Sequence, residues 1–112
     1  MKEKRTGAAG DNMKALERER VRAKVLGALN NKKYVARTIA GIADEAHLKS
    51  EIVREALRSD PALNELVRVY PRKSLSGSFM VTTQEKFQKR APFKDKIIDL
   101  FASNRPELDD VI

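Results

Sequence analysis

The chain has 112 residues, of which 41% are hydrophobic and 35% charged, and this length suggests a single domain with a modest core. It contains no cysteine, which excludes disulfides and thiolate metal sites and fits a reducing compartment. The sequence has no apolar run of about 18 residues and no apolar signal-peptide segment, which favours a cytoplasmic protein without a membrane span.

The formal net charge of +7 is concentrated in two separate blocks of the chain. Residues 1–33 hold ten basic and four acidic residues, and residues 66–96 hold eight basic and two acidic residues. The remaining segments, residues 34–65 and 97–112, each carry more acidic than basic side chains. Basic blocks of this kind favour nucleic acid or another anionic partner, and the alternative is a set of solvated Lys and Arg side chains that maintain solubility.

The N-terminal third of the chain predicts an arm followed by a helix. Residues 1–13 lack apolar periodicity and contain Gly-Ala-Ala-Gly, which is typical of a flexible basic arm. An apolar stripe then predicts a first helix from about Lys14 to Asn30. This stripe consists of Leu16, Val21, Val25, Ala28 and Leu29.

Two short helices separated by a tight turn are expected next. Residues 34–37 are β-like and predict a strand stub. Thr38 is a good N-cap for a second helix over about 39–47, since its hydroxyl can accept a bond from an unpaired N–H group. Ser50 is expected to cap a third helix over about 51–59 in the same way.

The third helix is predicted to end at Asp60-Pro61, a cap followed by a residue that suits the first helical position, and a short helical turn over 62–65 follows. The hydrophobic period then changes from 3.6 to 2, so that strands around Val67–Val69 and Phe79–Thr82 enclose a polar, turn-rich loop. Thr82 and Glu85 fit a capping box, which predicts another helix from about 83 to 90.

The last part of the chain predicts an amphipathic helix over 91–104 and an acidic tail over 105–112. The apolar stripe of this helix consists of Phe93, Ile97, Leu100 and Phe101. Two interpretations remain open: the stripe packs onto the core, or it forms the seam of a two-fold homodimer.

The order of these elements resembles the winged helix-turn-helix superfamily, and the segments RTIAGIADEAHLKSEIVREAL and LVRVYPRKSLSGSFMVTT carry the resemblance. It covers about residues 16–83. It implies a mainly α fold with a small antiparallel β-hairpin (α+β), in which a winged helix-turn-helix domain at residues 14–90 precedes an extra C-terminal helix. His47 stands where a glycine is common, which requires either a longer helix or left-handed backbone at a non-glycine residue.

In this superfamily the third helix usually enters the major groove, and the hairpin loop lies over the DNA backbone or minor groove. The resemblance therefore implies a non-enzymatic protein that binds double-stranded DNA, such as a transcriptional regulator. The third-helix positions that it assigns to DNA are Lys49, Ser50, Arg54 and Arg58, and the hairpin positions are Arg68, Arg72, Lys73, Ser74 and Ser76.

The alternative is a winged-helix module that binds a protein within a larger assembly. The pairs Glu51–Arg54 and Glu55–Arg58 have i,i+3 spacing, so their charges can neutralise each other on the third helix. Two acidic side chains on this helix would also face a polyanion. A protein-facing surface is therefore the competing interpretation of the same residues.

No catalytic site, metal site or cofactor is expected. The tetrad Asp44-Glu45-Ala46-His47 has the letters of a helicase Walker B box, but no glycine in the chain is followed by lysine, as a phosphate loop requires. The single histidine, without any cysteine, cannot complete a common zinc site or a nucleophile–base pair.

Overall fold

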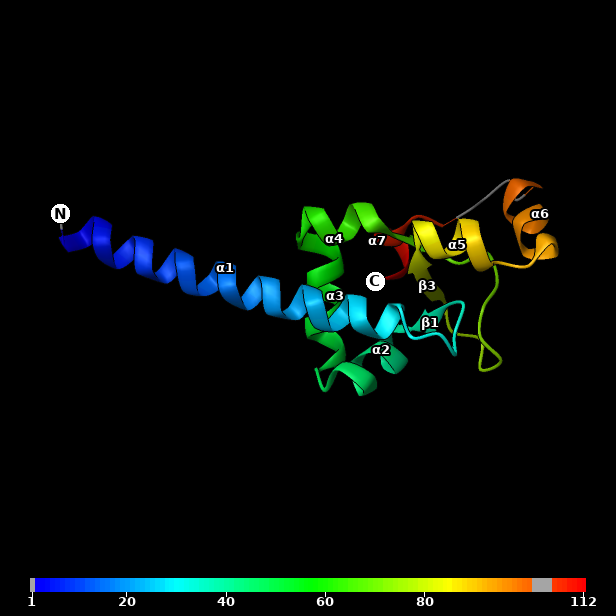
Figure 1. Ribbon diagram of the computed structural model, residues 1–112, viewed down its shortest axis with the longest axis horizontal. Helices are drawn as coiled ribbons and strands as arrows, with labels where there is room; N and C mark the ends of the chain where they lie inside the picture. The colour runs from blue at the N-terminus through cyan, green and yellow to red at the C-terminus, as the bar shows by residue number, and fades with distance from the viewer. Residues whose placement is uncertain (1, 102–105) are drawn as a thin grey trace.

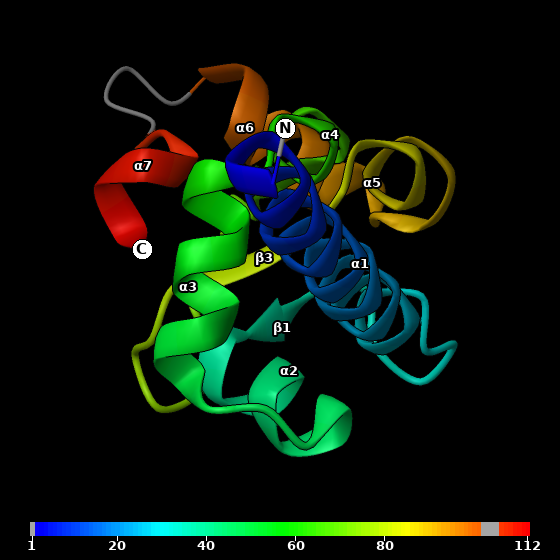
Figure 2. The same cartoon turned by 90° about the vertical axis from the view of Figure 1, so that its left-hand side faces the viewer.

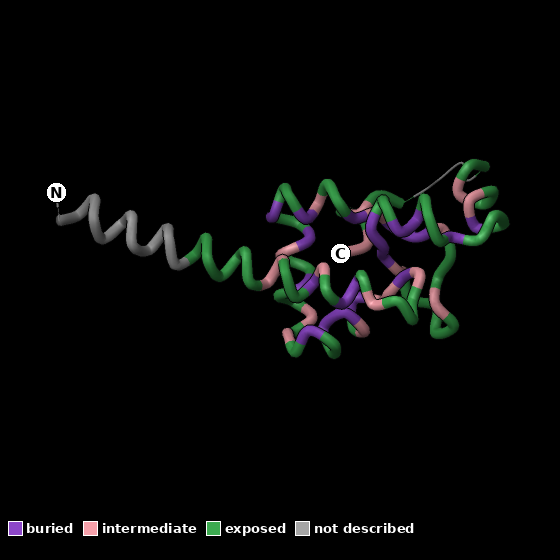
Figure 3. The backbone as a smooth tube through the Cα atoms, in the orientation of Figure 1, coloured by how far each residue is buried: buried purple, intermediate pink, exposed green. Residues whose placement is uncertain are grey.

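The computed structural model describes residues 2–101 and 106–112, and a long helix projects from its compact body (Figure 1). This helix, α1 (Lys2–Leu29), gives the molecule its extents of 59 × 27 × 24 Å. Among residues 14–29 of α1, the buried side chains lie in the last turns, where the helix meets the body (Figure 3). α1 begins at Lys2, so it includes the segment for which we predicted a flexible arm. Most residues of that segment are strong helix formers, which explains the earlier start.

The two short helices lie where the sequence predicts them. Strand β1 (Arg37–Thr38) leads into α2 (Ile39–Ala46), and the Thr38 hydroxyl accepts a bond of 3.0 Å from the Gly41 N–H, as predicted. His47 ends α2 in the left-handed region with a φ of 56°, which confirms the second of the two expected conformations. This residue lets the chain turn directly into the next helix.

Helix α3 (Ser50–Ser59) begins at the residue that we expected to be its cap. The N-cap is Lys49, whose side chain makes no capping bond, so the prediction of a Ser50 cap was wrong. At the other end, Asp60 caps α4 (Pro61–Leu66) by accepting a bond of 3.1 Å from the Ala62 N–H, as predicted. The capping prediction succeeded at Asp60 because the following Pro61 fixes where α4 begins.

A three-stranded antiparallel sheet completes the centre of the body. Strands β2 (Val67–Val69) and β3 (Met80–Thr83) form the predicted hairpin, and β1 pairs with the far edge of β3, giving the order β1-β3-β2. The short strand stub expected over 34–37 is therefore real but lies slightly later. The fold is mainly helical with a small antiparallel sheet, as the sequence predicts.

Three helices follow the sheet: α5 (Gln84–Arg90), α6 (Phe93–Phe101) and α7 (Leu108–Val111). The N-cap of α5 is Thr83, not the predicted Thr82, whose hydroxyl instead donates to the Val35 carbonyl at 2.7 Å. The predicted end of the C-terminal helix at 104 lies outside the described residues. Helix α7 lies within the predicted acidic tail, for which the sequence analysis named no helix.

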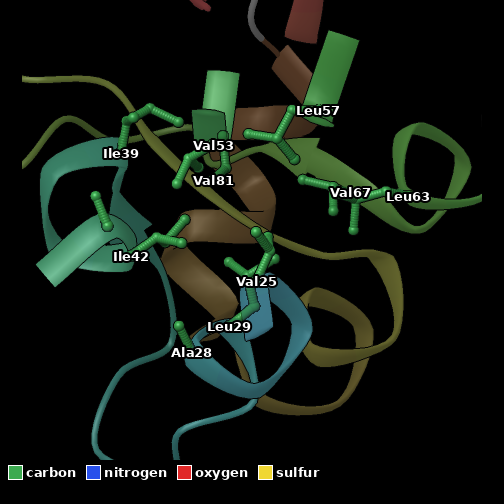
Figure 4. Packing of buried hydrophobic residues seen from close by; sticks show 11 residues of the cluster. Val25, Ala28, Leu29, Ile39, Ile42, Val53, Leu57, Leu63, Val67 and Val81 are labelled. Carbon is green, nitrogen blue, oxygen red and sulfur yellow. The ribbon is translucent and has the colours of Figure 1, made fainter. Parts of the chain in front are cut away.

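The main core gathers apolar side chains from α1, α2, α3, α4, β2 and β3, which meet at the centre of the body (Figure 4). Its fully buried members include Val25, Ile42, Val53 and Leu57, and Leu108 of α7 packs against its edge. A second cluster around Tyr70 and Phe87 joins the hairpin to α5. Within the described residues, no helix is long and apolar enough to cross a membrane.

Candidate nucleic-acid interface

The outward face of α3 carries opposite charges at alternating positions. Val53 and Leu57 are fully buried on the inner face, which leaves the acidic and basic side chains of this helix exposed. The Arg58 guanidinium lies 3.3 Å from the Glu55 carboxylate and also donates to the Ile112 backbone oxygen at 3.1 Å. One of the two predicted Glu–Arg pairs therefore forms.

Arg54 differs from Arg58 in its environment. Its side chain is exposed, and within the described part of the chain it makes no hydrogen bond or ion pair. Lys49 is also exposed at the turn before α3, whereas Ser50 is half-buried as the first residue of the helix. Arg54 and Lys49 are consequently the two predicted third-helix residues whose charges remain available to a ligand.

The loop between β2 and β3 is organised by its own hydrogen bonds. The Gly77 N–H donates to the Ser74 carbonyl at 2.9 Å, with Gly77 at a φ of 86°. The Ser74 hydroxyl accepts from the Ser78 N–H at 3.1 Å and lies 2.9 Å from the Ser76 hydroxyl. The ammonium group of Lys73 lies 4.6 Å from the centroid of the Phe79 ring. This loop therefore presents one lysine and several hydroxyls on an ordered turn.

Arg72, predicted as a backbone contact in the same loop, is engaged with a buried carboxylate. Its guanidinium donates two bonds of 2.9 Å to Asp95 of α6, which is completely buried and also accepts from the Tyr70 hydroxyl. The Arg72 partner holds the pKa of the Asp95 carboxyl below its ordinary value, against the opposing effect of burial. Burial and the neighbouring carboxylate raise the pKa of Tyr70 to about 12.

Arg68 has a second anchoring role. Its guanidinium pairs with Asp99 of α6 and stacks on the Phe87 ring at 3.9 Å from the ring centroid. Two of the three basic residues predicted for the hairpin therefore fix α6 to the sheet. Sequence analysis missed these contacts because Asp95 and Asp99 look like ordinary polar positions of an amphipathic helix.

The apolar stripe of α6 faces solvent. The exposed fractions of Phe93, Leu100 and Phe101 are 78%, 71% and 75%, and Ile97 is 36% exposed. These values contradict the interpretation in which the stripe packs into the core of its own chain. Five large apolar side chains on one short helix, including Ile98, form an unusual exposed patch.

Neither a metal site nor a selective small-molecule site is evident in the part of the chain that the structure describes. No group of three or more His, Cys, Asp or Glu side chains could hold a metal there. A cleft of about 660 Å³ runs beside β2, between the hairpin and α7. Its lining mixes the cations Arg68, Arg72 and Lys73 with the carboxylates of Asp99 and Glu107, a combination that selects no single class of ligand.

The chain matches no family model, no curated protein and no solved structure. The geometry of its own elements is therefore the basis for assigning a function.

Proposed function

We propose that the chain is a winged helix-turn-helix protein that binds double-stranded DNA. The observation that carries this proposal is the arrangement of its elements: α2, α3 and the short α4 connect β1 to the β2–β3 hairpin in a sheet of order β1-β3-β2. Figure 2 shows α3 and the hairpin loop on the same flank of the body. In DNA-binding winged helices, a helix and a hairpin loop so placed contact neighbouring parts of one duplex.

The side chains on this flank divide into two proposed roles. Arg54 and Lys49 contact base edges or the adjoining backbone from α3, because their charges are not neutralised within the described chain. Lys73, Ser74 and Ser76 contact phosphates from the hairpin loop. Arg58 and Arg72 are less available to bind DNA, since Glu55 and Asp95 already accept their hydrogen bonds.

Changing Arg54 to alanine is expected to weaken binding to a preferred duplex by about 1–3 kcal/mol and binding to random duplex much less, because it removes a base contact. Changing Lys73 to alanine is expected to weaken binding to the preferred and the random duplex equally. It should reduce the slope of log K against log salt by about 0.9, because one phosphate contact is lost. Fluorescence titration at several salt concentrations measures both effects.

The matched control for these variants is Arg20→Ala, which removes a cation that is also exposed, from α1. The affinity of this variant for duplex DNA should equal that of the unmodified chain. If micromolar protein fails to bind any duplex at roughly 50 mM salt, the proposed function is wrong, since nonspecific binding alone should be detectable under these conditions.

A second candidate function is protein binding, and the exposed apolar face of α6 favours it. The simplest partner is a second copy of the chain, whose α6 would cover the same patch by two-fold symmetry. Ion pairs from Arg68 and Arg72 hold α6 firmly against the sheet, so the apolar face is presented by an anchored helix. Such a homodimer would also place two α3 helices for paired half-sites on DNA.

The double substitution Ile97→Ser and Phe101→Ser is expected to convert a dimer to a monomer in sedimentation equilibrium. The fold should persist, because both side chains are exposed in the single chain. Lys94→Ser, on the same helix, is the control and should remain dimeric. An unmodified chain that is monomeric at high concentration would eliminate the homodimer.

A further inference from the structure

A second group of basic residues gathers far from α3. Lys32 and Lys33 lie in the turn after α1, Lys89 and Arg90 form the last turn of α5, and Lys96 belongs to α6. We call these five residues the basic flank. They come from separate parts of the sequence, and none was assigned a role by the sequence analysis.

Hydrogen bonds hold the basic flank together. The Arg90 guanidinium donates to the Lys32 carbonyl at 2.9 Å, which fixes the turn against α5. The Lys96 ammonium donates to the Gln88 carbonyl at 2.7 Å, which brings the start of α6 to the end of α5. Three elements thus meet in a defined arrangement, in contrast to lysines scattered over a surface.

Beneath this surface, Lys86 joins α5 to the end of α1. Its side chain is buried, and its ammonium donates bonds of 2.7 Å to the carbonyls of Leu29 and Asn31. Burial lowers the pKa of Lys86, and the positive charge of Arg90 lowers it further. Lys86 therefore occupies the carbonyl of Leu29, the last residue of α1, and that of Asn31 in the following turn, so the exposed lysines of the basic flank are not needed at these two carbonyls.

The basic flank has a large excess of positive charge. Its five cations have one exposed acidic neighbour on α5, Glu85, which pairs with Lys89 at 3.2 Å. The other nearby carboxylate, Glu45, accepts a bond of 2.9 Å from Asn31 and one of 2.5 Å from Arg37, and the positive charge of Lys33 also helps to lower its pKa. The side chains of Lys32 and Lys33 make no hydrogen bond or ion pair with any residue that the structure describes.

Structural roles within the chain account for only some of the cations of the basic flank. Lys89 and Arg90 stabilise the C-terminal end of the α5 dipole, but Lys32 and Lys33 lie in a turn and serve no helix end. The outward face of α3, in comparison, balances two arginines with two glutamates. The strongest local positive field of the body is therefore expected at the basic flank.

We propose that the basic flank binds the phosphate backbone of double-stranded DNA as a second, sequence-independent surface. Figure 2 shows α5 and the turn after α1 on the flank opposite α3 and α7, so one straight duplex on α3 does not reach it. When exposed lysines bind phosphates, counterions condensed on the DNA are released, and the resulting affinity needs no contacts with bases. This step rests on the proposed function: with one duplex on α3 and another on the basic flank, the chain holds two duplex segments at once.

The triple variant Lys32→Gln, Lys33→Gln and Lys89→Gln tests the second surface, since these side chains are exposed and, among the residues that the structure describes, Lys89 pairs only with the exposed Glu85. The probe is a short labelled duplex of random sequence. The unmodified chain is expected to bind two duplexes per chain, and the weaker of the two sites should lose most of its affinity in the variant. The slope of log K against log salt should fall by about 2.7 for the weaker site, or 0.9 per lost phosphate contact.

The control variant Lys14→Gln, Arg18→Gln and Lys24→Gln removes three cations that are also exposed, from α1. It should still bind two duplexes; an equal loss in this control would show that binding follows net charge, which overturns the proposal. The single variant Lys33→Gln should lower the slope by about 0.9, which checks the result with the least disturbance of the fold.

A fourth variant, Arg54→Gln with Lys73→Gln, separates this proposal from the proposed function. If it abolishes all binding while the basic-flank triple variant changes nothing, the second surface is wrong and the proposed function stands. If the reverse occurs, the basic flank is upheld as the DNA surface, and both the α3 interface and simultaneous binding of two duplexes fail. Binding to anionic vesicles without binding to the duplex would also overturn the proposal.

Discussion

Replacing Asp95 with alanine is expected to lower the free energy of unfolding by about 3 kcal/mol, because it breaks a buried ion pair and leaves its partners without their acceptor. The Asp95 carboxylate is fully buried and accepts bonds from Arg72 and Tyr70. Arg72 is half-exposed and can turn to water, which places the expected loss at the lower end of the range for buried pairs. Urea unfolding followed by circular dichroism measures it.

Two substitutions test the cause of that loss. Asp95→Asn keeps the size of the side chain and one acceptor oxygen, so its effect should be smaller than that of Asp95→Ala. Lys94→Ala, the exposed neighbour, should change the free energy of unfolding by less than about 0.5 kcal/mol. A loss below about 1 kcal/mol for Asp95→Ala would mean that α6 is not anchored through this carboxylate.

Replacing Asp60 with alanine is also expected to lower the free energy of unfolding by about 3 kcal/mol, because one carboxylate has two structural roles. Asp60 is 1% exposed; it caps α4 at the Ala62 N–H and accepts bonds of 2.7 and 3.0 Å from the Arg22 guanidinium. Its loss removes the cap and leaves the guanidinium without its acceptor. Thermal and urea unfolding measure the change.

Asp60→Asn separates the two roles, because an amide oxygen can still cap α4 but carries no charge for Arg22. It should destabilise the fold less than Asp60→Ala. Equal effects of the two variants would assign the whole contribution to the ion pair.

Acid titration gives an independent readout for both carboxylates. Hydrogen bonds from Arg22 and Arg72 lower the pKa of Asp60 and Asp95, respectively, in the folded chain. Stabilisation from a lowered pKa is fully present above the unfolded value, about 3.9, and is lost as the pH falls through the folded pKa. The unmodified chain should therefore lose stability below about pH 4, and each asparagine variant should lose less over the same interval.

The hairpin contacts link stability to the proposed DNA surface. Arg68 and Arg72 follow one another along the β2 end of the hairpin, but each binds an aspartate of α6. Substituting either arginine therefore changes the support of α6 as well as any contact with DNA. Lys73 has no ion pair among the described residues, so it is the hairpin residue whose substitution reports on DNA most directly.

The sequence by itself determined the elements that depend on local patterns. Thr38 and Asp60 cap α2 and α4 as predicted, since capping involves residues only two or three positions apart. The alternation around Val67 and Val69 identified the hairpin, because side chains of a strand alternate between its faces. The mainly helical class with a small antiparallel sheet followed from these local signals. The exposed candidates Arg54 and Lys73 also came from the sequence, as residues of a predicted helix and loop.

Only the tertiary structure decided which charged residues are available to a ligand. Arg72 and Asp95 are 23 residues apart, and Arg22 and Asp60 are 38 apart, so no periodicity or spacing rule pairs them. The packing of α6 on the hairpin converted a predicted DNA contact into an anchor, and it turned the apolar stripe outward. The basic flank arose in the same way, because α5 packs across the end of α1 and brings Arg90 against the Lys32 carbonyl. Such contacts depend on how whole elements pack, which local sequence does not specify.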